Sequence, residues 1–100
     1  MNILLVCASG MSTSLLVTKM QKESEASGNH DTINACSVDE LELQIDTCEV
    51  LLIGPQIRYK LKGISEIAIG KDKAFAVIDS ISYGMVDGKK VLAQAYELKK

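Results

Sequence analysis

Short apolar runs alternate with helical segments along the whole chain, and this alternation restricts the folds that the chain can adopt. Three runs, 3–6, 50–53 and 74–78, are continuously apolar. Such runs are typical of parallel strands buried on both faces. A fourth run, 32–36, alternates apolar with polar residues and predicts a less buried strand.

Helical periodicity fills the segments between these strands. Segments 11–26 and 56–70 place apolar residues three or four positions apart, which predicts amphipathic helices. Asp87 is the expected N-cap of a last helix, and 27–29 is a typical helix end.

The remaining segments are shorter. Ser37 or Asp39 is expected to cap a short helix that runs to about Ile45. The segment 79–85 is expected to form a loop.

Strands that alternate with helices pair in parallel through right-handed crossovers. We therefore predict an α/β fold with three layers: an open sheet of four parallel strands in the order 2-1-3-4, with helices on both faces. Ligands of such sheets bind beyond the carboxyl ends of the strands, where the winding reverses. Cys7 and Gly54 end the first and third strands, on either side of that reversal.

Composition narrows the class of protein. A chain of 100 residues fits one domain, 1–100, and its formal charge of −2 gives no support to nucleic-acid binding. It contains no apolar stretch near the roughly 18 residues that span a membrane. Three cysteines without paired spacing fit a reducing compartment, so we expect a cytoplasmic protein.

Cys7 is the strongest candidate for chemistry. It stands between a strand and the predicted start of a helix, where unpaired N–H groups and partial positive charge lower a thiol pKa and attract phosphate. The competing interpretation is that Cys7 is only the last buried residue of a core strand.

The residues after Cys7 have the composition of an anion-binding loop. Successive backbone N–H groups form such sites, glycine allows close approach, and hydroxyls add donors, although serine and threonine also cap helices routinely. The candidate phosphate-binding residues are Ala8, Ser9, Gly10, Met11, Ser12, Thr13 and Ser14.

The absence of an arginine after Cys7 distinguishes a phosphoryl carrier from a cysteine phosphatase. A C-x5-R phosphatase needs an arginine six positions after its cysteine, to clamp the phosphoryl oxygens. Thr13 occupies that position, and no Arg or Lys occurs between Cys7 and Lys19. The loop therefore favours a carrier that holds a phosphoryl group over an enzyme that hydrolyses it.

Three blocks of sequence carry a family resemblance: LVCASGMSTSLLV at 5–17, LIGPQI at 52–57, and VIDS followed by YG and VDG at 77–88. The chain resembles the IIB component of the sugar phosphotransferase system (PTS), of the lactose/cellobiose (diacetylchitobiose) family. The resemblance covers almost the whole chain and implies a fold similar to low-molecular-weight tyrosine phosphatases.

The resemblance also implies a reaction and its partners. Cys7 would accept a phosphoryl group from a phosphohistidine of the partner IIA. The resulting phosphocysteine would pass it to a sugar of the cellobiose, lactose or diacetylchitobiose class, held by the membrane subunit IIC. Such a phosphotransferase needs no cofactor or metal, works transiently at the inner face of the membrane, and with one accessible thiol fits a monomer.

Three further residues are candidate accessory or docking positions. Gln56 follows the third strand and is able to donate to phosphate or to a partner, although a plain strand-to-helix turn explains the sequence equally well. Asp79 follows the fourth strand, where it is either a general acid or a residue that orders the loop. Tyr83, like Met11, is expected to be exposed near the thiol as a docking contact or as ordinary packing.

The other residues with reactive or charged side chains are expected to have structural roles or to be exposed to solvent. Cys36 and Cys48 match no zinc spacing and are expected to be buried, and His30 is expected to be solvated without a partner. The exposed face of the third helix is expected to carry Arg58, Lys60 and Lys62, with docking of an acidic partner by Arg58 as an alternative.

Two other functions compete with the carrier. A small cysteine phosphatase or an arsenate-reductase-like enzyme would use the same thiol, but Thr13 stands where the arginine is needed. A flavodoxin-like receiver or regulatory module would need acidic residues at the ends of the first and third strands, where Cys7 and Gly54 stand.

Overall fold

Four parallel strands form the middle layer of the molecule. The computed structural model describes residues 1–7 and 14–99. The strands are β1 (Asn2–Cys7), β2 (Thr32–Ser37), β3 (Val50–Ile53) and β4 (Ala74–Val77), paired in the order β2-β1-β3-β4. The order and the parallel pairing confirm the fold predicted from the sequence.

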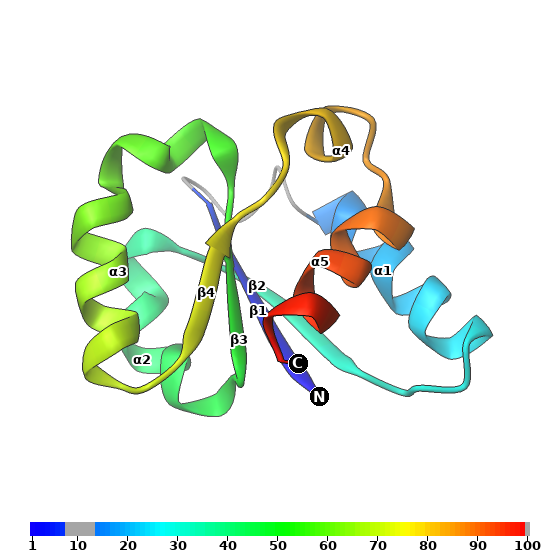
Figure 1. The fold of residues 1–100 in the computed structure, drawn as a ribbon, viewed down its shortest axis with the longest axis horizontal. Helices are drawn as coiled ribbons and strands as arrows, with labels where there is room; N and C mark the ends of the chain where they lie inside the picture. Colours follow the sequence, from blue (N-terminus) through cyan, green and yellow to red (C-terminus); the bar gives the residue numbers. More distant parts are fainter. Residues whose placement is uncertain (8–13, 100) are drawn as a thin grey trace.

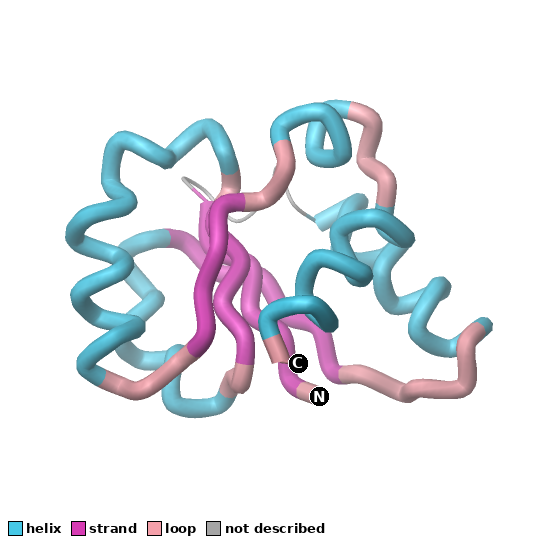
Figure 2. Tube along the Cα trace, in the orientation of Figure 1, coloured by secondary structure: helices cyan, strands magenta, loops and turns pink. Residues whose placement is uncertain are grey.

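Helices cover both faces of this sheet. Figure 1 shows α1, α4 and α5 on one side of the strands and α2 and α3 on the other, and Figure 2 shows the same three layers by element type. The helices are α1 (Ser14–Ala26), α2 (Leu41–Gln44), α3 (Leu61–Gly70), α4 (Ser80–Gly84) and α5 (Gly88–Leu98), with short 3-10 segments η1 (Val38–Glu40), η2 (Ile45–Thr47) and η3 (Pro55–Lys60).

Burial on both faces explains the continuous apolar runs of β1 and β3. In β1, Leu5 packs into the core beneath α1 and α5, whereas Leu4 and Val6 pack into the core beneath α2 and α3. Because adjacent residues of a strand point to opposite faces, a strand between two helical layers needs apolar side chains at every position. The edge strand β2 alternates instead, with Ile33 buried between exposed neighbours.

Local signals in the sequence account for several element ends. Gly28, just after α1, has a φ of +76°, a conformation that glycine adopts at little cost. Ser37 precedes η1, and Glu40 Oε1 accepts hydrogen bonds from its backbone nitrogen at 3.3 Å and its hydroxyl at 3.1 Å. Asp87 caps α5 by accepting from the Lys90 backbone nitrogen at 3.1 Å, as predicted.

The prediction of a loop at 79–85 is wrong, because α4 occupies most of that segment. The Asp79 carboxylate accepts hydrogen bonds from the backbone nitrogen of Ser82 at 3.0 Å and from its hydroxyl at 2.9 Å. These bonds satisfy donors of the first helical turn and stabilise a helix of only five residues.

All four strands end at the same edge of the sheet, since they are parallel. Cys7 is the last residue of β1, Gly54 directly follows β3, and Asp79 lies two residues beyond β4. In Figure 1 this edge faces α4 at the top of the view. The fold therefore brings the residues that the sequence singled out to one end of the molecule.

Candidate functional site

The candidate nucleophile is placed by the central strand of the sheet. Cys7 pairs in register with Ser37 of β2, and the preceding residue, Val6, pairs with Ile53 of β3. The candidate loop residues 8–13 lie outside the described residues. The last of the predicted loop residues, Ser14, begins α1, and its carbonyl accepts a hydrogen bond from the Thr18 hydroxyl at 3.1 Å.

The expectation that the thiol is accessible is wrong for this structure. Cys7 has 0% of its surface exposed. The physical reason is its place on a central strand, with β2 and β3 on either side and helices over both faces. The sulfur is therefore shielded on both faces of the sheet.

A backbone hydrogen bond joins the two strands at the reversal of the winding. The Gly54 nitrogen donates to the Val6 carbonyl oxygen at 2.8 Å, one residue before Cys7. A Cβ on Gly54 would lie 2.5 Å from Oε1 of Gln56 and 3.3 Å from the Val6 carbonyl oxygen. The absence of a side chain at Gly54 therefore lets the Gln56 amide lie against the end of the sheet.

Gln56 and Tyr83, separated by 27 positions in sequence, meet at this edge. Nε2 of Gln56 donates a hydrogen bond to the phenolic oxygen of Tyr83 at 2.8 Å. Tyr83 is half-buried and packs against the core beneath α1 and α5, so it is less exposed than expected. The structure thus brings together two of the three predicted accessory residues.

The third accessory residue, Asp79, is exposed and serves as the N-cap of α4. Hydrogen bonds from the backbone and side chain of Ser82 hold the pKa of Asp79 below its ordinary value of 3.8. The carboxylate is therefore ionised at neutral pH, and it orders the segment that carries Tyr83. A general acid must hold a proton in its resting state, so this environment does not suit that role.

The other two cysteines are core residues, as predicted. Cys36 and Cys48 are 2% and 3% exposed and belong to the core beneath α2 and α3. Burial, followed by the negative charges around it, raises the pKa of Cys36 to about 11. Burial also raises the pKa of Cys48, whose thiol donates to the Ile45 carbonyl oxygen at 3.2 Å. Both therefore stay protonated and poorly nucleophilic at neutral pH.

The remaining charged candidates are surface residues. His30 is exposed, and so are Arg58, Lys60 and Lys62, which confirms their predicted exposure. Within residues 1–7 and 14–99, no three His, Cys, Asp or Glu side chains are grouped so as to hold a metal ion. None of the described helices is long and apolar enough to cross a membrane.

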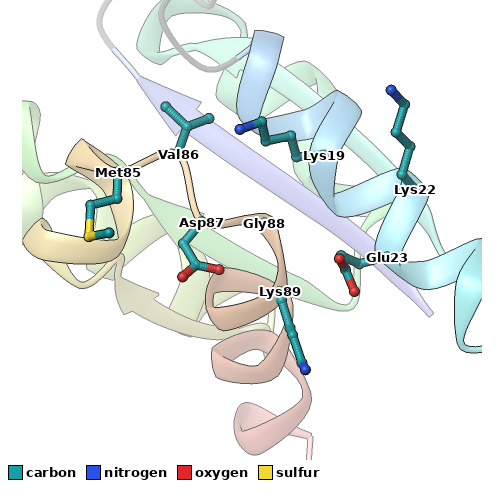
Figure 3. Close-up of a pocket in the computed structure, with 8 residues that line it drawn as sticks. All are labelled: Lys19, Lys22, Glu23, Met85, Val86, Asp87, Gly88 and Lys89. Atoms are coloured by element: carbon teal, nitrogen blue, oxygen red, sulfur yellow. The ribbon is translucent and has the colours of Figure 1, made fainter.

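A groove of about 350 Å³ lies between α1 and the start of α5, as Figure 3 shows. Lys19, Lys22 and Glu23 of α1 form one wall, and the connection 85–89 forms the other. Gly88 brings the two helices together here, since a Cβ on it would lie 2.7 Å from the backbone carbonyl carbon of Lys19. The groove is thus the seam where two packed helices meet.

Comparison with known proteins identifies the family. The family model for the lactose/cellobiose-specific IIB subunit of the PTS matches residues 2–94. The chain belongs to the lactose/cellobiose-specific IIB family of the PTS. This membership confirms the resemblance carried by the Cys7, Gly54 and Asp79 segments, and it makes the chain a sugar-specific IIB component.

Curated relatives match this IIB chain over nearly its whole length. The oligo-beta-mannoside-specific EIIB component of Bacillus subtilis is 41% identical over 96 residues, covering 96% of this chain and 93% of the relative. The cellobiose-specific EIIB component of Lactococcus lactis subsp. lactis is 39% identical over 101 residues, covering 96% and 94%. The galactose-specific component of Lactococcus lactis subsp. cremoris is equally similar, at 39%.

Solved structures agree with the fold of this IIB component. The solution structure of the cellobiose-specific phosphotransferase IIB component from Borrelia burgdorferi superposes with a TM-score of 0.83 at 39% identity, covering 98% of this chain and 90% of that one. The lactose-specific IIB domain from Streptococcus pneumoniae gives a TM-score of 0.89 at 13% identity, covering 100% and 98%. The second likeness concerns the fold alone.

Two features of this edge escaped the sequence reasoning. Ser82 was not recognised as a partner of Asp79, although aspartate is a preferred N-cap residue and marks a helix start. The contact between Gln56 and Tyr83 has no sequence signal, because each belongs to a different helical layer and the pairing depends on tertiary packing.

Proposed function

We propose that this IIB component is a phosphoryl carrier that uses Cys7. In the first step the sulfur of Cys7 attacks the phosphorus of a IIA phosphohistidine: the S–P bond forms, the P–N bond breaks with its electron pair going to the imidazole nitrogen, and the thiol proton passes to the departing imidazole. In the second step a sugar hydroxyl bound by IIC attacks the same phosphorus. The O–P bond forms, the S–P bond breaks, and the hydroxyl proton is released.

The observation that carries this proposal is the position of Cys7. It is the last residue of β1 at the reversal of strand order, the place where ligands of open parallel sheets bind. The residues proposed to receive the phosphoryl oxygens are those of the following segment 8–13 together with Ser14. No cofactor is needed, because positioning and backbone dipoles supply the stabilisation in phosphoryl transfer.

The alternative thiols are poor candidates for the carrier. Cys36 and Cys48 are buried in the core beneath α2 and α3, and burial raises the pKa of both. A thiol that stays protonated at neutral pH is a weak nucleophile. Cys7 is buried too, so its place in the fold is what distinguishes it: of the three cysteines only Cys7 ends a strand at the candidate edge.

Exposed apolar side chains at the same edge support docking of protein partners. Leu15 in the first turn of α1, Tyr59 in η3, and Ile81 and Met85 around α4 are each more than half exposed. These elements follow the carboxyl ends of β1, β3 and β4. Apolar and aromatic residues are enriched in interface centres, and we propose that this face, in a monomer, contacts IIA and then IIC in turn.

The sugar is proposed to be of the cellobiose, lactose or diacetylchitobiose class, selected by IIC at the inner face of the membrane. Relatives of nearly equal identity are named for three different sugars: oligo-beta-mannoside, galactose and cellobiose. The variety of sugars among relatives of similar identity supports a IIB component that delivers the phosphoryl group without itself selecting the sugar.

Intact mass after mixing with phosphorylated IIA tests the carrier. The wild-type protein should gain the mass of one phosphoryl group and keep it on denaturation at mild pH. Cys7→Ser should lose the stable gain, whereas the matched controls Cys36→Ser and Cys48→Ser should retain it. Absence of any gain, or a gain that Cys7→Ser retains, would refute the proposal.

A further inference from the structure

The side-chain amide of Gln94 joins α5 to the end of β4. Its Nε2 donates to the Val77 carbonyl oxygen at 2.8 Å, and its Oε1 accepts from the Asp79 backbone nitrogen at 3.2 Å. Between these two residues, the backbone nitrogen of Ile78 donates inward to the Ile53 carbonyl oxygen of β3 at 2.8 Å. Because β4 is an edge strand, the Gln94 amide lies where a peptide group of a further strand would otherwise bind.

Asp79 connects this anchor to α4. Its carboxylate accepts from the backbone nitrogen of Ser82 at 3.0 Å and from the Ser82 hydroxyl at 2.9 Å. At the other end of α4, the Ser82 carbonyl oxygen accepts from the Asp87 backbone nitrogen at 2.9 Å. A helix of five residues is too short to be stable alone, so the position of α4 depends on such contacts. The contact that ties its first turn to α5 is made by Gln94.

The helix α4 presents two exposed apolar side chains beyond the carboxyl end of β4 (Figure 1). Ile81 and Met85 are 71% and 67% exposed and lie four positions apart, on one helical face. The segment 80–85 between them and around them contains no charged residue. The carboxylates that flank it, Asp79 and Asp87, both accept hydrogen bonds from helix N–H groups. An uncharged apolar patch of this kind suits an apolar surface on a protein partner.

We propose that Gln94 is a positioning residue that holds α4, so that Ile81 and Met85 form a fixed contact surface for phosphorylated IIA. This inference rests on the proposed carrier function, in which IIA approaches the edge where Cys7 ends β1. IIC is the less suitable occupant, because the anionic inner surface of the membrane opposes the two flanking carboxylates. A surface that is fixed before docking loses less conformational freedom, so the anchor raises the affinity for IIA without changing the chemical step.

Rapid-quench transfer from phosphorylated IIA, measured over a range of IIA concentrations, separates KM from the maximal rate. Gln94→Met keeps the side-chain length and the helix propensity and removes both hydrogen bonds of the amide. It should raise KM for IIA about 3- to 10-fold at an unchanged maximal rate, because α4 is correctly placed in only a fraction of the molecules. Gln21→Met is the matched control, since Nε2 of Gln21 donates to the Ile33 carbonyl oxygen of the other edge strand, β2, at 3.1 Å. It should leave KM unchanged.

Ile81→Ala tests the contact surface itself. It should raise KM about 3- to 10-fold, whereas Ile69→Ala, at an apolar residue of α3 that is 66% exposed, should not. Because Gln94 acts through the surface that includes Ile81, the double variant Gln94→Met/Ile81→Ala should raise KM by less than the product of the two single effects.

Amide hydrogen exchange tests the anchor without IIA. In Gln94→Met the backbone amide of Ser82, which donates to Asp79, should exchange about 3- to 10-fold faster than in wild type. In Gln21→Met it should exchange at the wild-type rate. Unchanged exchange at Ser82 in folded Gln94→Met would refute the anchoring of α4. A purely structural amide would lower the melting temperature in both glutamine variants and leave KM intact, which would also refute the proposal.

The outcomes separate this inference from the carrier function itself. If the wild-type protein takes no phosphoryl group from IIA, the carrier function is refuted and the inference falls with it. If it is phosphorylated and Gln94→Met has a KM within about twofold of wild type, only the positioning role of Gln94 is refuted. If Ile81→Ala takes phosphate from IIA normally but passes it slowly to sugar through IIC, α4 contacts IIC and the assignment to IIA is wrong.

Discussion

The hydroxyl of Tyr96, near the end of α5, donates a hydrogen bond to the carboxylate of Asp31 just before β2. The Ser24 hydroxyl donates to the same carboxylate at 2.9 Å, and the amino group of Met1 lies 3.2 Å from its other oxygen. This cluster joins α1, β1, β2 and α5 at the edge of the sheet opposite Cys7. These contacts therefore stabilise the fold at one edge of the sheet, whereas Cys7 lies at the opposite edge.

Replacing Asp31 should make folding stability less sensitive to acid. Burial acts to raise the pKa of Asp31, but hydrogen bonds from Tyr96, Ser24 and the amino terminus outweigh it, and the pKa lies below its ordinary value of 3.8. A lowered carboxyl pKa contributes stability that is complete above the ordinary value and is lost as pH falls through the folded-state pKa. Urea unfolding at pH 7 and at pH 3 should show the gap between wild type and Asp31→Asn shrinking toward the lower pH.

Asp31→Ala removes the acceptor altogether. It should cost about 2–4 kcal/mol at pH 7, because it leaves the partly buried hydroxyls of Ser24 and Tyr96 without their charged partner. Asp39→Asn removes the same charge from an exposed site on η1 and controls for the change in net charge. If Asp31→Asn and Asp39→Asn lose equal stability at each pH, the hydrogen bonds to the Asp31 carboxylate make no special contribution to folding stability.

Most of the fold follows from periodicity because the central strands β1 and β3 are buried on both faces of the sheet. The runs that became β1, β3 and β4 have no polar residue between 3–6, 50–53 and 74–77, a pattern that is typical of strands in a parallel sheet. The helix α4 was missed because five residues are too few for a periodic signal, and its stability comes from the Asp79 cap and from packing of Tyr83.

The candidate edge was predictable, but its contacts were not. Parallel topology alone places Cys7, Gly54 and the segment after β4 together, which made Gln56, Asp79 and Tyr83 reasonable candidates. Their hydrogen bonds depend on how far each helix extends beyond the ends of the strands. The spacing of apolar residues in the sequence does not predict that distance. Burial of Cys7 likewise depends on its neighbouring strands and not on its own sequence context.

The contact between α1 and α5 should tolerate no side chain at Gly88. A Cβ there would lie 2.7 Å from the backbone carbonyl carbon of Lys19 and 2.8 Å from the backbone nitrogen of Met20. Backbone atoms cannot rotate away, so α5 would have to move off α1. Gly88→Ala should therefore lose about 1–3 kcal/mol in urea unfolding, the usual range for overpacking.

Gly63→Ala is the matched control for that substitution. Its Cβ would meet nothing within 4 Å, and alanine favours a helix over glycine by about 0.5–1 kcal/mol. The two Gly→Ala changes should therefore shift stability in opposite directions. Equal effects would show that the approach of α5 to α1 is looser than the structure has it.

Thiol labelling should show that Cys36 and Cys48 are protected in the folded protein. With a pKa of about 11, Cys36 is a thiolate in only about one molecule in a thousand at pH 8, and burial raises the pKa of Cys48 as well. Iodoacetamide at pH 8 should add no label at Cys36 or Cys48 of the folded protein and should add three labels in urea. Folded Cys7→Ala should take none, and labelling of Cys36 or Cys48 in the folded state would contradict their assignment to the core.

The ionised state of Asp79 predicts that this protein is not an aryl phosphatase. Its carboxylate accepts two hydrogen bonds from Ser82, and these hold its pKa below the ordinary value, so it has no proton to give a leaving group at neutral pH. Wild type and Asp79→Asn should both hydrolyse p-nitrophenyl phosphate no faster than Cys7→Ala does. Turnover that disappears in Cys7→Ala and falls at least roughly tenfold in Asp79→Asn, the scale of a lost general acid, would instead establish phosphatase chemistry at this edge.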